Sequence, residues 1–165
     1  MTLIAEAQVI AVLNACRKHS IMIVTAESCT GGLIAGALTD IAGSSDVVDR
    51  GFVTYSNEAK NEMIGVPMEL IIQVGAVSKE VAIAMAEGAL ANSCAGISIA
   101  VTGIAGPGGG SAEKPVGLVH IASARKGFAT LHRECRFGEK SREAIRHETV
   151  LSALALVLEG LNSQP

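Results

Sequence analysis

Short runs of apolar residues alternate along the chain with segments in which apolar residues recur every three or four positions. The run at residues 21–24 is continuous, which is typical of a strand buried on both faces of a sheet. The periodic segments predict helices, because residues three and four apart share one helix face. In chain order, the pattern predicts helices at residues 5–19, 30–39, 57–64, 67–72, 79–92 and 142–161, and strands at residues 21–24, 47–55, 97–102, 116–123 and 128–137.

The order of these elements predicts the fold class. The strand, helix and strand over residues 21–55 form a crossover unit, which implies parallel pairing. The last two strands are joined by a turn near Lys126 and Gly127, which predicts an antiparallel pair. We therefore expect an α/β fold of three α/β/α layers with a mixed, mostly parallel sheet. Without a linker, repeat or low-complexity segment, residues 1–165 are expected to form one domain.

Composition narrows the class of partner. The chain has 165 residues, of which 49% are hydrophobic and 2% aromatic, so its core must be aliphatic. The net charge of -3 argues against a nucleic-acid-binding surface, which would need a basic excess. The four cysteines form no CxxC pair, which argues against a zinc site. Because no signal peptide or membrane-spanning stretch is evident, we expect a cytoplasmic protein with no membrane partner.

The segment Thr25-Ala-Glu-Ser-Cys-Thr-Gly-Gly32 joins a predicted strand to a predicted helix. Open α/β sheets place their chemistry at such junctions, which makes Ser28 a candidate nucleophile. The surrounding residues are not the Gly-x-Ser-x-Gly elbow of α/β-hydrolases. Two other interpretations stay open: Ser28 caps the following helix, or the neighbouring Cys29 is the nucleophile.

A second polar segment, residues 54–60, follows the next strand and is expected at the same sheet edge as Ser28. Its Lys60 falls early in a helix, where the helix dipole disfavours positive charge. With partial burial, this field would lower the pKa of Lys60 and suit it to act as a neutral base. The alternative is an exposed surface lysine. Tyr55, the only tyrosine, either packs or donates a hydrogen bond in the site.

Residues 102–111 form a glycine-rich loop after a third apolar strand. Glycines let backbone N–H groups approach phosphate oxygens closely, although a Walker loop and the dinucleotide fingerprint are both missing. The loop is therefore either a phosphate-binding element or a flexible connection. Arg142 and Arg146 lie one turn apart on the last predicted helix. They could clamp a phosphate together, or they could belong to a solvated helix face.

Together these motifs resemble the CinA C-terminal-domain family. The resemblance is carried by Thr25-Ala-Glu-Ser-Cys-Thr-Gly-Gly32, Gly51-Phe-Val-Thr-Tyr-Ser-Asn-Glu-Ala-Lys60, Gly75-Ala-Val-Ser78, Gly103-Ile-Ala-Gly-Pro107 and Glu113-Lys-Pro-Val-Gly117. The family includes stand-alone nicotinamide mononucleotide amidohydrolases. The resemblance thus implies deamidation of nicotinamide mononucleotide, a step of pyridine nucleotide recycling. It also implies that Ser28 and Lys60 are the catalytic pair.

The expected reaction is acyl transfer from the substrate's carboxamide to Ser28, with Lys60 as base and Lys60 or Tyr55 as the proton donor to ammonia. Backbone N–H groups near the start of the helix would stabilise the oxyanion, and Glu27 would face the cationic ring. The expected substrate-binding residues are Glu27, Thr30, Gly31, Thr102, Gly103, Ala105, Gly106, Gly108, Gly109, Arg142 and Arg146. We expect no metal, no cofactor and a homo-oligomer, with a dimer as one form. Two alternatives are a non-catalytic module that binds a phosphorylated nucleotide and an amidase for another amide.

Overall fold

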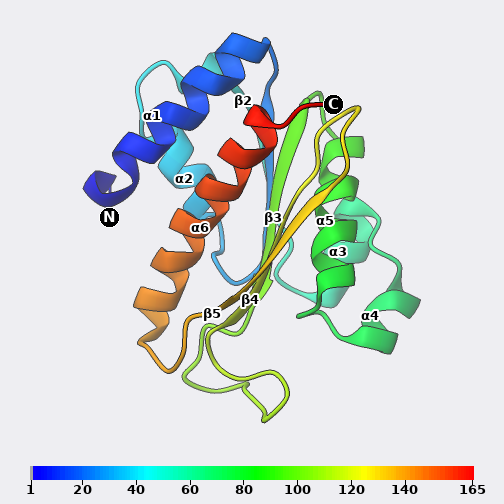
Figure 1. Ribbon diagram of the computed structural model, residues 1–165. Coiled ribbons are helices and arrows are strands. Elements are labelled where there is room, and N and C mark those ends of the chain that lie inside the picture. The colour runs from blue at the N-terminus through cyan, green and yellow to red at the C-terminus, as the bar shows by residue number, and fades with distance from the viewer. Residues whose placement is uncertain (1) are drawn as a thin grey trace.

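A computed structural model describes residues 2–165 of the chain, with side chains from residue 5 onward. A central sheet lies between two helical layers: α1, α2 and α6 cover one face, and α3, α4 and α5 cover the other (Figure 1). The helices are α1 (Thr2–His19), α2 (Leu33–Thr39), α3 (Asn57–Ile64), α4 (Met68–Val74), α5 (Lys79–Ala91) and α6 (Arg142–Asn162), with a short 3-10 helix at Ser44–Asp46. The strands are β1 (Ile23–Glu27), β2 (Val48–Val53), β3 (Ile97–Gly103), β4 (Leu118–Ser123) and β5 (Leu131–Arg136).

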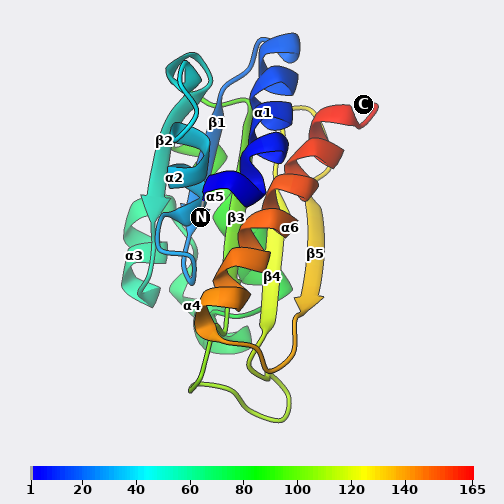
Figure 2. The ribbon, with the colours of Figure 1, turned by 90° about the vertical axis from the view of Figure 1, so that its left-hand side faces the viewer.

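The five strands follow the order β2-β1-β3-β4-β5 across the sheet (Figure 2). Strand β1 pairs in parallel with both β2 and β3, so that Thr25 lies between Gly51 and Ile99. Strand β4 runs antiparallel to both β3 and β5. This arrangement confirms the expected three-layer α/β fold with a mixed sheet. It also brings the carboxyl ends of β1, β2 and β3 to one edge of the sheet.

The junction after β1 differs from the prediction. The strand runs to Glu27, three residues past the expected end, and α2 begins at Leu33 instead of residue 30. Residues 28–32 form a turn, in which Gly31 and Gly32 adopt positive φ angles of 59° and 108°. Residues other than glycine rarely adopt such φ angles, so the two glycines permit the turn. The turn leaves Ser28 at the tip of the strand and outside the helix.

The aliphatic residues form two cores, one on each face of the sheet. On the first face, Leu13 of α1 and Leu154 of α6 are completely buried against the sheet. On the second face, Met85 of α5 is equally buried. Helix α5 also approaches α3 closely, because a Cβ atom added at Gly88 would lie 1.9 Å from the carbonyl oxygen of Ile64. Glycine at this position thus allows the helix that carries Lys60 to pack tightly.

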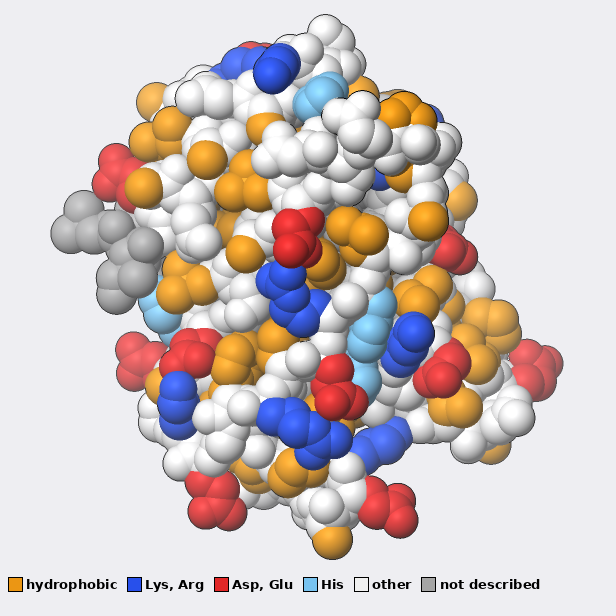
Figure 3. Space-filling model, in the orientation of Figure 1, with side chains coloured by type: hydrophobic (Ala, Val, Ile, Leu, Met, Phe, Trp, Pro, Cys, Tyr) orange, Lys and Arg blue, Asp and Glu red, His pale blue; other side chains and the backbone are white. Residues whose placement is uncertain are grey.

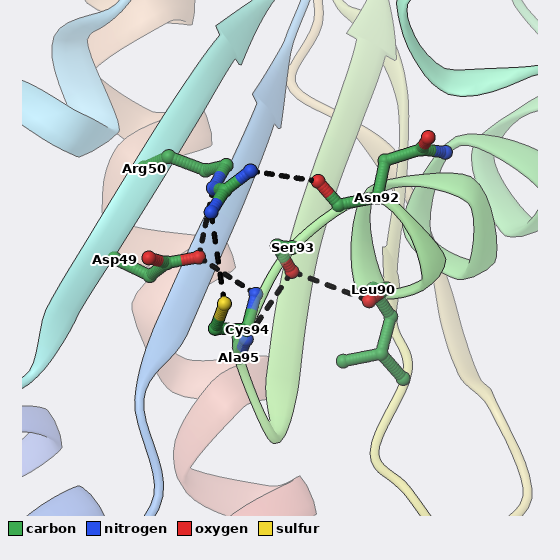
Figure 4. Close-up of polar contacts among 7 residues, drawn as sticks. All are labelled: Asp49, Arg50, Leu90, Asn92, Ser93, Cys94 and Ala95. Atoms are coloured by element: carbon green, nitrogen blue, oxygen red, sulfur yellow. Dashed lines mark hydrogen bonds and ion pairs between the residues drawn. The ribbon is translucent and has the colours of Figure 1, made fainter.

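A polar cluster fastens the opposite end of the sheet, away from the carboxyl ends of the parallel strands (Figure 4). The carboxylate of Asp49 accepts hydrogen bonds from Arg50 Nε and from the backbone N–H of Cys94, both at 2.9 Å. Arg50 also donates to the carbonyl of Asn92 at 3.1 Å. The Cys94 N–H, together with Arg50, lowers the pKa of Asp49. The cluster ties the edge strand β2 to the loop between α5 and β3.

Strand β5 forms the other edge of the sheet and carries charged side chains. Arg133 pairs with Glu159 at 2.7 Å, and Arg136 pairs with Glu134 at 3.2 Å. Figure 3 shows positive and negative side chains interspersed over the face that this edge presents. Charges of this kind discourage a sheet edge from pairing with another chain. Among residues 2–165, no helix combines the length and the apolarity that crossing a membrane would require.

Candidate active site

Ser28 lies at the carboxyl end of β1, and its side chain is nearly buried. Its backbone N–H donates to the carbonyl of Val101 on β3 at 3.1 Å, which continues the sheet pairing for one residue. Its own carbonyl accepts from the N–H of Gly31 at 3.0 Å and closes the turn. These two bonds fix the backbone of Ser28 on both sides, and its hydroxyl donates to the carbonyl of Tyr55 at 3.5 Å.

Lys60 lies in α3, and its side chain reaches back toward the end of β1. Its Nζ atom lies 3.1 Å from Ser28 Oγ, 2.9 Å from the carbonyl oxygen of Thr54 and 3.3 Å from that of Tyr55. The residue is only 1% exposed. Burial lowers the pKa of Lys60, because a charged amine loses its hydration there. Lys60 is therefore a buried amine in direct contact with the serine, and the surface-lysine alternative is wrong.

A cavity of about 230 Å³ opens above this pair. It is formed by the turn after β1, the segment before and within α3, the segment before α5, the end of β3 with its following loop, and the start of α6. Its lining residues are Ser28, Cys29, Tyr55, Asn57, Lys60, Ala76, Val77, Thr102, Gly103, Ala105 and Arg142. Three segments expected at one edge of the sheet thus meet around a single cavity, as their positions after the three parallel strands predict.

Arg142 and Tyr55 come together at the mouth of the cavity. The Arg142 guanidinium donates to the carbonyl of Gly106 at 2.7 Å and to the Tyr55 hydroxyl at 3.1 Å. Tyr55 is 61% exposed, so its ring does not pack in the core. Its hydroxyl is engaged by Arg142, whereas its backbone carbonyl faces Lys60. The pair joins the segment after β2 to the glycine-rich loop and to α6.

Arg146 does not share the environment of Arg142, although one helical turn separates them. Its Nε donates to the carbonyl of Cys29 and its terminal nitrogen to that of Thr30, both at 3.2 Å. Arg146 is not among the side chains that line the cavity. The expectation that both arginines clamp one phosphate is thus not supported by the geometry. Arg146 instead holds the backbone of the turn that carries Ser28.

The side chain of Glu27 also binds backbone groups. It is 1% exposed, and its carboxylate accepts hydrogen bonds from Thr30 Oγ1 at 2.6 Å and from the N–H groups of Ile34 and Ala35 at 2.8 and 3.0 Å. These N–H groups lie in the first turn of α2, where they lack partners within the helix. Both oxygens of Glu27 are therefore engaged in capping α2. This geometry contradicts the expected contact between Glu27 and a substrate ring.

Part of the glycine-rich loop lies at the cavity. Thr102, Gly103 and Ala105 line it, and Gly106 supplies the carbonyl that Arg142 binds. Gly108 and Gly109 are exposed and lie outside the lining. The base of the loop is fixed to the segment before α5, since Thr102 Oγ1 donates to the carbonyl of Ala76 at 2.9 Å. Only the first half of the loop is therefore positioned to contact a ligand in the cavity.

Cys29 also lines the cavity, next to Ser28. Burial raises the pKa of its thiol to about 11, so that the nucleophilic thiolate is scarce at neutral pH. This argues against Cys29 as the nucleophile. Within the part of the chain that the structure describes, no three His, Cys, Asp or Glu side chains form a group that could ligate a metal ion.

Three residues that line the cavity were not predicted from the sequence: Asn57, Ala76 and Val77. Asn57 could have been found, because it lies three positions before Lys60 in a predicted helix and so shares its face. Ala76 and Val77 belong to a motif that carried the family resemblance, but neither side chain suggests a chemical role. Their place at the cavity follows from the path of the chain between α4 and α5.

Comparisons with known proteins agree with this architecture. Residues 5–161 match the family model described as the CinA C-terminal domain. The chain is 50% identical over 142 residues to the protein named nicotinamide-nucleotide amidohydrolase PncC of Escherichia coli K12, covering 86% of this chain and 85% of that one. The solved structure of competence/damage inducible protein CihA from Agrobacterium tumefaciens is 55% identical, with a TM-score of 0.92, and the match covers 96% of this chain and 95% of that one.

Other relatives are much longer than this chain. It is 49% identical over 141 residues to the CinA-like protein of Akkermansia muciniphila, which is 86% of this chain but only 34% of that protein. It likewise spans 28% of a competence-damage relative from Caldicellulosiruptor bescii, at 53% identity over 115 residues. The family model nevertheless covers almost all of the sequence. This chain therefore belongs to the CinA C-terminal-domain family.

Proposed function

We propose that this chain is a nicotinamide-nucleotide amidohydrolase, which converts nicotinamide mononucleotide and water into nicotinic acid mononucleotide and ammonia. The observation that carries the proposal is the 3.1 Å contact between Lys60 Nζ and Ser28 Oγ at the base of a cavity. The relative from Escherichia coli, matched over 85% of its length, is named a nicotinamide-nucleotide amidohydrolase, which supports this choice of substrate. The four free cysteines suit a reducing cytoplasm, where such a nucleotide would be met.

The hydrogen bonds of Lys60 suit a neutral amine that acts as a base. A neutral amine has two N–H bonds and one lone pair. In the structure Lys60 Nζ donates to Ser28 Oγ and to the carbonyls of Thr54 and Tyr55. A neutral Lys60 can keep its two bonds to the carbonyls and turn its lone pair toward Ser28 Oγ, so that the serine hydroxyl donates to it. In the first step, the proton of Ser28 passes to Lys60 as the serine oxygen forms a bond to the carboxamide carbon.

The oxyanion of the tetrahedral intermediate needs hydrogen-bond donors. The N–H of Gly31 is engaged by the carbonyl of Ser28, so the expected role of Gly31 as a donor is not supported. The N–H groups of Cys29 and Thr30 have no backbone acceptor among residues 2–165. We assign the oxyanion to the N–H of Cys29, because Cys29 lines the cavity whereas Thr30 is completely buried and lies outside the lining. Arg146 holds this part of the turn through the carbonyls of Cys29 and Thr30.

Departure of ammonia needs one proton on the amide nitrogen. Lys60 holds the proton taken from Ser28 and can return it to this nitrogen as the carbon–nitrogen bond breaks. Tyr55 is a less suitable donor, since its hydroxyl lies beside Arg142 at the mouth of the cavity, whereas Lys60 contacts Ser28 directly. A water molecule then attacks the ester carbon and gives its proton to Lys60, which passes it to Ser28 as the acid is released.

The substrate's phosphate suits the mouth of the cavity, where Arg142 supplies a positive charge and the backbone around Gly103 and Ala105 can approach closely. The carboxamide, at the opposite end of the molecule, would then reach Ser28. Substrate orientation in this scheme follows from the placement of a buried reacting pair below an exposed guanidinium.

The experiment is a measurement of ammonia release from nicotinamide mononucleotide by the purified protein. We expect release from the wild type, a loss of at least about 10³-fold in Ser28→Ala, and nearly full activity in Cys29→Ala. Binding of the nucleotide without any release would instead indicate a non-catalytic binding module. Equal release from unrelated amides would indicate an amidase for another substrate.

A further inference from the structure

One polar side chain at the cavity has no hydrogen-bond partner among the side chains and backbone groups that the structure describes. Among the other lining side chains, Lys60, Thr102 and Arg142 are engaged in the hydrogen bonds described above. Asn57 also lines the cavity, yet its side-chain amide makes no hydrogen bond to any residue from 5 to 165. It offers both a donor and an acceptor to a ligand.

The position of Asn57 along α3 places it between the reacting pair and the solvent. Asn57 and Lys60 are three residues apart, so their side chains lie on the same face of the helix. Lys60 is buried at the base of the cavity, whereas Asn57 is exposed at its mouth. A substrate with its carboxamide at Ser28 would therefore present a group further from the amide to Asn57.

The charges around the mouth indicate which group this is. Arg142 brings the positive charge that suits the phosphate dianion, and it reaches the cavity from α6. The Asn57 side chain is a neutral amide, so it adds no charge to match that of a phosphate. The ribose, which joins the ring to the phosphate, carries two neutral hydroxyls that pair well with an amide.

We propose that Asn57 is a specificity-determining residue that hydrogen-bonds the ribose hydroxyls of the substrate. The proposal rests on the proposed function, because it takes the ligand to be nicotinamide mononucleotide. Through this contact the site distinguishes a ribonucleotide from amides of similar size that lack the sugar. Substitution of Asn57 should leave the fold intact, since no hydrogen bond within the described residues depends on its side chain.

The test compares the wild type with Asn57→Ala, using Glu62→Gln, an exposed position of α3 outside the cavity, as the matched control. Two ligands are used: nicotinamide mononucleotide and its 2′,3′-dideoxy analogue. We expect Asn57→Ala to lose about 10-fold in affinity and in kcat/KM for the mononucleotide, as the loss of one or two hydrogen bonds predicts. For the dideoxy analogue, the two proteins should behave alike, and Glu62→Gln should match the wild type for both ligands.

An equal loss for both ligands would overturn the proposal, because the contact would then not involve the hydroxyls. No loss for either ligand would overturn it as well. Affinities measured by calorimetry need no turnover, so they separate this inference from the proposed function. A wild type that binds the mononucleotide but releases no ammonia would contradict the proposed amidohydrolase activity. The comparison of the two ligands would still decide the role of Asn57. A wild type that binds neither ligand would contradict both.

Discussion

The Nζ atom of Lys60 lies 3.1 Å from Ser28 Oγ, although 32 positions separate the two residues in the sequence. The contact exists because β1 and β2 are parallel neighbours, so that the turn after one and the helix after the other start from the same sheet edge. Lys60 is almost completely buried there, and burial lowers its pKa. Two of the predictions below follow from this single contact.

The first concerns the pH dependence of activity. In the proposed mechanism Lys60 must be neutral to accept the proton of Ser28, so kcat/KM should rise with pH and level off above the pKa of Lys60. This pKa should lie below the usual lysine value of about 10.4, as burial requires. Ammonia release measured from pH 6 to pH 10 checks this expectation. Lys60→Met should lose about 10²- to 10⁴-fold and show no comparable rise. A flat wild-type profile would argue against Lys60 as the base.

The second concerns stability. The pKa of Lys60 is lower in the folded state than in the unfolded state, so the unfolded state binds more protons between the two values. The free energy of unfolding should therefore increase with pH through this window. Relative to Lys60→Met, the wild type should gain stability between pH 7 and pH 10 in urea denaturation experiments. If the difference in the free energy of unfolding between the two proteins is constant over this range, folding does not lower the pKa of Lys60.

The third separates the two arginines of α6. Arg142→Met should mainly raise KM for the mononucleotide, with a loss of about 10- to 100-fold in kcat/KM, because the proposed charged contact to phosphate would disappear. Arg146→Met should mainly lower kcat, since the carbonyls of Cys29 and Thr30 lose the group that holds their turn. Steady-state kinetics of the two variants check this. Identical effects on KM would restore the idea of a shared phosphate clamp.

The fourth concerns Glu27. Glu27→Gln keeps the size of the side chain but replaces one acceptor oxygen with an NH₂ group, which cannot accept from the first turn of α2. We expect a loss of about 1–3 kcal/mol in the free energy of unfolding. Chemical denaturation measures this, with the exposed Glu62→Gln as the control. A variant with unchanged stability but a raised KM would instead favour the contact with the substrate ring that the geometry contradicts.

The fifth uses two helical glycines in opposite surroundings. A Cβ atom at Gly36 of α2 would meet nothing within 4 Å, so Gly36→Ala should stabilise the protein by up to about 1 kcal/mol. At Gly88 the same atom would collide with the backbone of Ile64, and Gly88→Ala should destabilise by at least about 2 kcal/mol. Thermal unfolding of the two variants measures both effects. Shifts in the same direction would contradict the close packing of α3 and α5.

The sequence predicted the fold and the meeting of three segments at one sheet edge, because strand order and connection rules determine both. It could not decide between a buried and an exposed Lys60, since that depends on how closely α3 packs against its neighbours. Arg142 and Arg146 lie one helical turn apart in the sequence, which suggested that they share one function. Their actual partners depend on the three-dimensional paths of two separate loops.

Glu27 shows a different limit of sequence interpretation. A carboxylate in a strand that caps a helix seven and eight residues later leaves no familiar local pattern. The assignment became possible only once the structure showed where β1 ends and where α2 begins. The place of Asn57 at the cavity, by contrast, could have been predicted from its spacing to Lys60 alone.

Helix α6 supplies Arg142 and Arg146, and it packs against α1. During synthesis the ribosome makes the segments that hold Ser28 and Lys60 long before it makes α6. A nascent chain could thus bring its serine and lysine together while the turn after β1 still lacked its guanidinium support. Catalytic competence should therefore arise only after α6 has been made and has packed against α1.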